Sequence, residues 1–126
     1  MPSNSETLHE PDLPPAVVDR HRAIVSIMEE LEAVDWYDQR AAATDDASLA
    51  EVLGHNRDEE KEHAMMTLEW LRRHDPVLDR HMRTYLFTEG DILGIEEAAE
   101  HGGGSTTEPS SGLSIGSLRN DNEDSL

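Results

Sequence analysis

The sequence contains no cysteine, which excludes disulfide bonds, thiolate metal ligands and a cysteine nucleophile. Lysine is nearly absent, because Lys61 is the only one among the ten basic residues. Against them stand 28 acidic residues, which give a formal net charge of -18 at pH 7. A chain without a basic patch cannot release phosphate counterions on binding nucleic acid. We therefore exclude non-specific nucleic-acid binding and expect the surface to attract cations.

Long apolar runs are also missing. No stretch of 18 apolar residues occurs, so we expect no membrane-spanning segment. The first residues have neither the basic region nor the apolar run of a secretory signal, so we expect no such signal. Together with the lack of cysteine, these features predict a cytoplasmic protein. With 126 residues, 36% hydrophobic and 30% charged, the chain suffices for one domain with a small core.

Composition divides the chain into four parts. Residues 1–15 carry four prolines and no periodicity, and predict a disordered arm. Residues 16–90 contain the aromatic residues and four of the five methionines, and predict a helical domain. Residues 91–112 run from a weak helical patch into a Gly/Ser-rich stretch, and predict a flexible linker. Residues 113–126 hold a short apolar motif, LSIGSLR, followed by an acidic end.

The apolar spacing within the central part predicts helices. Residues 16–42 follow the three-four spacing of one long helix. Good N-cap residues come next, at Asp45, Asp46 and Ser48, and the last of these fits a capping box. The second helix should end before Pro76, because the residue ahead of a proline avoids the α region. A shorter third helix is expected from Pro76 towards Gly90. The sequence thus predicts an all-α fold, an antiparallel hairpin plus a short helix.

Polar side chains interrupt the apolar faces of both long helices. Glu30 lies within an apolar row of the first helix, formed by Ala23, Ile27, Val34 and Tyr37. Glu60 and His63 lie three residues apart between the apolar ends of the second helix. A buried, unpaired carboxylate is costly, so such a group neutralises, pairs or binds a cation. Glu-x-x-His on one helix lets a carboxylate oxygen and an imidazole nitrogen reach one metal ion.

The register of the hairpin brings these residues together. Residues equidistant from the turn lie at the same height, and the midpoint between Glu30 and Glu60 falls at Asp45. We therefore expect the two glutamates to face each other. A ferritin-like di-iron site needs twice this ligand set, so a two-fold symmetric dimer would complete both the site and a four-helix bundle. Oxygen and imidazole ligands suit iron or manganese.

Each of these residues, taken singly, could have a purely structural role. Glu30 could pair with Arg57 or Lys61, and His63 could be a hydrogen-bonded core histidine. The simplest role for five further residues is a solvated acidic face, made of Glu29, Glu32, His55, Glu59 and Glu62. Trp36 and Tyr37 are by default core or interface aromatics, although Tyr37 could also support a metal site. The combination of Glu30, Glu60 and His63 favours the metal site.

Two segments, HRAIVSIMEELEAVDWYDQR at 21–40 and HNRDEEKEHAMMTLEWLRRHDPVLDRHMRTYLF at 55–87, resemble the encapsulated ferritins. LSIGSLR is similar to the encapsulin-targeting peptide that follows a flexible linker in that family. The resemblance covers most of residues 8–90 and also 113–119. It implies a ferroxidase enclosed in an encapsulin shell, with a hairpin subunit that is half of a ferritin fold. It also implies iron at a dimer interface and dimers assembled into a ring-shaped decamer.

The resemblance also implies roles for individual residues. The di-iron ferroxidase centre would use Glu30, Glu60 and His63 from both subunits. Beside it would lie the aromatic pair Trp36 and Tyr37, of which we count Tyr37 as catalytic. Other metal positions would be a site where iron enters, at Glu29 and Glu32, and peripheral sites, at His55, Glu59 and Glu62. The acidic end NDNEDSL extends past the usual targeting motif.

The sequence therefore predicts a ferroxidase that oxidises Fe(II) to Fe(III) with oxygen and delivers iron for storage inside an encapsulin nanocompartment. One alternative is a rubrerythrin-like peroxide reductase with the same ligands, although that class usually has a thiolate iron centre and this chain has no cysteine. Another alternative is a non-enzymatic cargo protein that only binds iron.

Overall fold

The predicted all-α architecture is confirmed. A computed structural model describes residues 7–101, and all regular secondary structure in that range is helical. The helices are α1 (Pro15–Ala43), α2 (Ala47–Arg73), α3 (Pro76–Tyr85) and α4 (Ile92–His101). The chain divides into two units, Met1–Asp79 and Arg80–Leu126. Within the described range, no helix combines the length and apolar character needed to cross a membrane.

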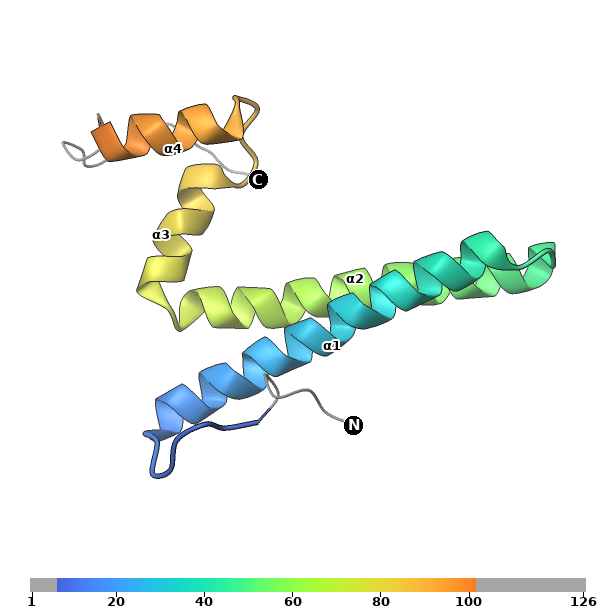
Figure 1. The fold of residues 1–126 in the computed structure, drawn as a ribbon, viewed down its shortest axis with the longest axis horizontal. Coiled ribbons are helices and arrows are strands. Elements are labelled where there is room, and N and C mark those ends of the chain that lie inside the picture. Colours follow the sequence, from blue (N-terminus) through green and yellow to red (C-terminus); the bar gives the residue numbers. More distant parts are fainter. Residues whose placement is uncertain (1–6, 102–126) are drawn as a thin grey trace. The chain divides into compact units, whose positions relative to one another are not determined.

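Helices α1 and α2 form the predicted antiparallel hairpin and lie side by side along most of their length (Figure 1). Helix α1 begins at Pro15, a residue suited to the first helical position because its missing N–H would have no partner there. The carbonyl of Pro14 accepts hydrogen bonds from the next amides, those of Val17 and Val18. Helix α1 ends at Ala43, where the backbone of Thr44 becomes extended.

The turn between the two helices selects one N-cap from the three that the sequence offers. Asp46 is the N-cap of α2, and its carboxylate accepts a hydrogen bond of 2.9 Å from the amide of Leu49. Ser48 lies inside the helix, so the predicted capping box at this residue is wrong. The amide of Asp46 donates a hydrogen bond of 3.2 Å to the hydroxyl of Thr44. This contact holds Asp46 in the turn, where it can cap the helix.

The first turn of α3 is joined to α2 by polar contacts. Asp75 caps α3, because its side chain accepts a hydrogen bond of 3.0 Å from the amide of Leu78. The guanidinium of Arg72 binds both carboxylate oxygens of Glu69, each at 2.8 Å, and also pairs with Asp79. Hydrogen bonds from Arg72 and then Arg73 lower the pKa of Glu69 to about 2.

The hairpin has a very small core. Among the described residues only Ala23, Ala64 and Leu71 are buried, and Ala64 is 0% exposed. These three lie towards the open end of the hairpin, away from the turn. Many large apolar side chains of α1 and α2 remain exposed, namely Ile24, Met28, Leu31, Trp36, Leu49, Val52, Met65, Met66 and Trp70. The hairpin by itself therefore leaves much of its apolar surface uncovered.

The second unit differs from the prediction in two places. Helix α3 ends at Tyr85 and does not continue to Phe87, which adopts a left-handed backbone with φ of 63°. Helix α4 occupies residues 92–101, where the sequence predicted only a weak helical patch leading into a flexible linker. The carboxylate of Asp91 caps α4 through a 2.9 Å hydrogen bond from the amide of Gly94. An N-cap followed by Ala, Glu and Leu residues favours a helix more strongly than the apolar spacing suggests.

Several sequence predictions lie wholly or partly outside the described residues. Residues 7–14 contain no helix or strand. The predicted disordered arm extends beyond this range at its beginning. Three further predictions fall entirely outside the described residues: the remainder of the linker, the LSIGSLR motif at 113–119 and the acidic end.

The choice of N-cap can be tested with two neighbouring aspartates. We expect Asp46→Ala to lower the free energy of unfolding by about 1 kcal/mol, because the Leu49 amide loses its acceptor. Asp45→Ala removes the same charge one residue away and should change it far less. Chemical denaturation of the metal-free variants, followed by helical circular dichroism, measures both. Equal losses would contradict the assignment of the cap.

Candidate metal centre

Glu30 has a carboxylate oxygen in an unusual environment. The residue is half-buried on the inward face of α1, as its apolar neighbours predicted. Its Oε1 atom is fully buried and has no hydrogen-bond partner in the part of the chain that the structure describes. An unsatisfied buried carboxylate oxygen is costly to keep, so it marks a place where a cation can bind.

The two basic residues that could have neutralised Glu30 are engaged elsewhere. Arg57 of α2 pairs with Asp38 of α1 at 2.9 Å and with Asp58 at 3.0 Å. Lys61 pairs with the same Asp58 oxygen at 3.2 Å. Hydrogen bonds to Asp58 and then Asp38 raise the pKa of Arg57. The structure therefore does not show the alternative that the sequence allowed, a pairing of Glu30 with Arg57 or Lys61.

Glu60 and His63 come together on α2 as the Glu-x-x-His spacing predicted. The Nδ1 atom of His63 lies 3.5 Å from Oε1 of Glu60. The Glu60 side chain is 28% exposed and that of His63 is 48% exposed, so His63 is not a buried core histidine in the isolated hairpin. Both donors are accessible to a bound ion.

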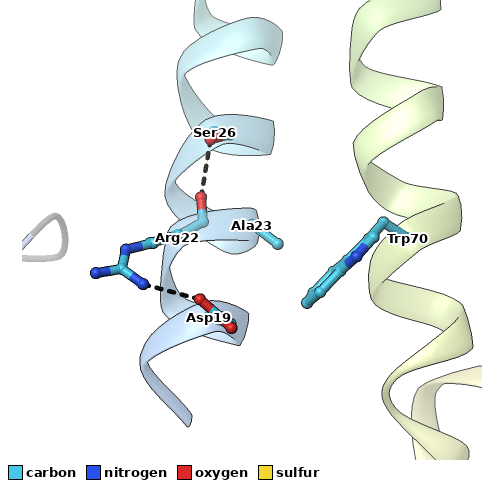
Figure 2. A pocket seen from close by; sticks show the side chains of 5 residues that line it. All are labelled: Asp19, Arg22, Ala23, Ser26 and Trp70. Atoms are coloured by element: carbon cyan, nitrogen blue, oxygen red, sulfur yellow. Dashed lines mark hydrogen bonds and ion pairs between the residues drawn. The ribbon is translucent and has the colours of Figure 1, made fainter. Parts of the chain in front are cut away.

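Contacts between α1 and α2 lie on either side of Glu30 and Glu60. Towards the open end, one hollow is lined by Trp70 of α2 and by four residues of α1, namely Asp19, Arg22, Ala23 and Ser26 (Figure 2). Towards the turn, Asp38 of α1 pairs with Arg57 of α2. Glu30 and Glu60 each lie between these two contacts along their own helices. The close approach of the two glutamates stays a prediction.

The aromatic pair of α1 is covered by a cation that the sequence analysis missed. The guanidinium carbon of Arg40 lies 5.5 Å from the ring centroid of Trp36 and 5.9 Å from that of Tyr37. These distances suit cation–π contacts. The three- and four-residue spacings from Tyr37 and Trp36 to Arg40 were the available signal. Tyr37 is half-buried, whereas Trp36 is 49% exposed.

The remaining predicted metal positions are surface residues. All of them are exposed, namely Glu29, Glu32, His55, Glu59 and Glu62. Within residues 7–101, no group of three or more His, Asp or Glu side chains is arranged to hold a metal ion.

The donors that are present fit iron chemically. Carboxylate oxygens and a neutral imidazole are ligands that iron accepts, and no thiolate competes. The unpartnered oxygen of Glu30 supplies a negative charge that lacks a protein partner. The fold and these side chains define a class: an all-α hairpin with Glu30 on the inward face of one helix and a Glu-x-x-His pair on the other.

Comparison with known proteins gives the family. The EncFtn-like family model matches residues 6–89. A Rhodospirillum rubrum protein named "Encapsulated ferritin-like protein" is 56% identical over 129 residues, covering 94% of this chain and 92% of that protein. The "Encapsulin nanocompartment cargo protein EncC" of Myxococcus xanthus is 33% identical over 106 residues, covering 75% of this chain and 80% of that protein. The chain belongs to the EncFtn-like family.

A solved structure supports the fold independently. The crystal structure of a Nitrosomonas europaea protein matches this chain with a TM-score of 0.66 and 54% sequence identity. The match covers 68% of this chain and 96% of the other. The helical fold that carries Glu30, Glu60 and His63 is therefore one that a related protein adopts in a crystal.

The environment of Glu30 predicts a trade-off between stability and metal binding. We expect Glu30→Met to raise the free energy of unfolding of the metal-free protein by about 1 kcal/mol, because it removes an unsatisfied buried oxygen. Fe(II), which should stabilise the wild type, should no longer stabilise this variant. Denaturation with and without Fe(II), under anaerobic conditions, measures both effects.

Glu29→Met is the matched control, because Glu29 is the exposed neighbour on the same helix. It should leave the stability of the metal-free protein nearly unchanged. A loss of stability in Glu30→Met would show that the carboxylate already has a partner in the metal-free protein.

Proposed function

We propose that this protein is a ferroxidase, which oxidises Fe(II) to Fe(III) with oxygen at a di-iron site shared by two copies of the chain. The observation that carries the proposal is the buried, unpartnered oxygen of Glu30 on the inward face of a hairpin that also bears the Glu60–His63 pair. The names of the two curated relatives, a ferritin-like protein and an encapsulin cargo protein, support an iron-related role.

A second copy of the chain supplies what one copy lacks. One hairpin provides one Glu and one Glu-x-x-His, and a ferritin-like di-iron site needs two of each. A two-fold axis doubles the set without any further residue. The same association would cover exposed apolar side chains of the hairpin, which are numerous for its length. Site completion and burial therefore favour the same homodimer, which would build the proposed ring-shaped decamer.

Each ligand has a role in the proposed reaction. Fe(II) is the substrate, and each ion loses one electron to oxygen. Glu30 and Glu60 would hold and bridge the two ions, and their negative charge favours the harder Fe(III) product. His63 would complete the ligands of each ion. Tyr37 lies two turns from Glu30 on the same helix face, where it would orient the ligands or join the reaction.

The exposed acidic residues extend the proposal to iron delivery. Glu29 and Glu32 would receive Fe(II) near the site, and the peripheral positions at His55, Glu59 and Glu62 would bind it more weakly. Their exposure suits transient binding of a hydrated cation. The net charge of -18 raises the local concentration of Fe(II) around the whole protein.

We further propose that the protein acts inside an encapsulin shell in the cytoplasm and reaches it through residues 113–119. An open hairpin cannot enclose a mineral, so a shell would retain the oxidised iron. The alignment with the Rhodospirillum rubrum protein covers 94% of this chain. Residues 113–126 are a larger share of the chain than the part left out, so the similarity extends into the segment that holds the proposed targeting motif.

The first test of this function removes the ligands singly. We expect Glu30→Ala, Glu60→Ala and His63→Ala each to lower the rate of aerobic Fe(II) oxidation by at least about tenfold, since each change removes two ligands from a symmetric site. Helix content should persist, because alanine is a strong helix former.

Glu51→Ala serves as a control, because it removes an exposed carboxylate from the same helix. Stopped-flow absorbance of Fe(III) formation measures all four variants. Wild-type rates in the three ligand variants would contradict the assignment. Fe(II) binding without oxidation in the wild type would instead indicate an iron-binding cargo protein.

Metal should also drive assembly. A site shared by two subunits binds metal only in the dimer, so Fe(II) must favour association by mass action. The bound ions also neutralise four facing glutamates that repel each other. At fixed protein concentration, analytical ultracentrifugation should show a shift from monomer to dimer and larger rings on adding Fe(II). A size distribution that is the same with Fe(II) and with chelator would argue against a shared site.

The tail should address the protein without taking part in oxidation. Deleting residues 113–126 should leave Fe(II) oxidation and ring assembly intact but prevent loading into a co-expressed shell. Replacing Leu113, Ile115 and Leu118 by Asp should have the same effect, because an apolar docking segment loses its contacts. Co-purification with the shell measures loading. Normal loading of both variants would show that residues 113–119 do not target the protein to the shell.

A further inference from the structure

Arg57 is the centre of an ion-pair network that joins the two long helices. Its Nη1 atom donates to Asp38 of α1 at 2.9 Å, and its Nε atom donates to Asp58 of α2 at 3.0 Å. Lys61 binds the same Asp58 oxygen at 3.2 Å. The two basic residues nearest to Glu60 in the sequence are thus both held by aspartates that are not proposed iron ligands.

The alternative partner of Arg57 would be a proposed iron ligand. Glu60 follows Arg57 by three residues, a spacing at which side chains meet on a helix surface. Its side chain is 28% exposed, so a guanidinium can reach it. The hydrogen bond from Nη1 of Arg57 to Asp38 directs the end of the guanidinium towards α1 instead. A guanidinium on Glu60 would occupy carboxylate oxygens and add a positive charge where Fe(II) must bind.

We propose that Asp38 is a positioning residue, which holds the Arg57 guanidinium away from Glu60 and so keeps the carboxylates of the metal centre available to Fe(II). The inference deepens the proposed function and rests on it. It differs from a mere brace between the helices, because a brace fails equally when either partner is removed. A holding residue is needed only while Arg57 is present.

The test is a double-mutant cycle on the full chain. Asp38→Asn should weaken anaerobic binding of Fe(II), measured by calorimetric titration, by about threefold or more, the size expected when a surface ion pair is exchanged. In aerobic oxidation KM should rise while kcat stays near the wild-type value. Arg57→Gln alone should not weaken binding, and Asp38→Asn with Arg57→Gln should restore the wild-type affinity.

A charge-matched control separates this from a general loss of negative charge. Arg22→Gln added to Asp38→Asn restores the net charge but leaves Arg57 in place, and Arg22 pairs with Asp19 near the start of α1. That double variant should keep the weakened affinity. Thermal melts of the metal-free variants check that the hairpin persists.

Three results would overturn the inference: unchanged Fe(II) affinity in Asp38→Asn, equal weakening in Arg57→Gln, or recovery with Arg22→Gln. A wild type that binds Fe(II) without oxidising it would refute the ferroxidase function alone. In that case the binding cycle would still decide the role of Asp38.

Discussion

Glu30 keeps a carboxylate oxygen away from water in a hairpin that gives it no hydrogen-bond donor. That unfavourable arrangement is the constraint on which the proposed site depends. Burying an unpaired charge costs desolvation free energy. A bound divalent cation offsets this cost most effectively. Arg57 and Lys61 do not relieve it, because they are bound to Asp38 and Asp58. The protein thus retains at this position the binding free energy that a metal ion would use.

The thin core of the hairpin links the two parts of the proposal, association and metal binding. Two helices pressed against each other bury only residues on their shared line of contact, here Ala23, Ala64 and Leu71. Their other apolar side chains, such as Met28 and Leu31, need another surface. In the proposed dimer, a second hairpin would cover both the exposed apolar side chains and the acidic ones. Neither requirement alone would fix the position of a partner as closely as the two together.

Local sequence signals predicted the helices well where the chain is long and periodic. The apolar row of Ala23, Ile27 and Val34 predicted the inward face of α1, and Glu30 lies on that face. Predictions for short segments were less successful. Ser48 lost the capping role to Asp46, since several adjacent residues could cap and only the path of the turn selects one. Helix α4 was predicted only as a weak helical patch, because its apolar spacing is weak, although Asp91 caps it.

The sequence by itself determined the helical hairpin, the Glu-x-x-His pair on α2 and the placement of Glu30 within an apolar stripe, since these follow from helical periodicity. The tertiary structure alone decided which charges pair. Arg57 could have met Glu30, Asp38, Asp58 or Glu60 by spacing, and it binds the two aspartates. Pairing of this kind depends on distances across two helices, which change with the crossing of the helices and with side-chain rotamers. Periodicity carries no information on either, so only the folded hairpin shows that Glu30 is left without a partner.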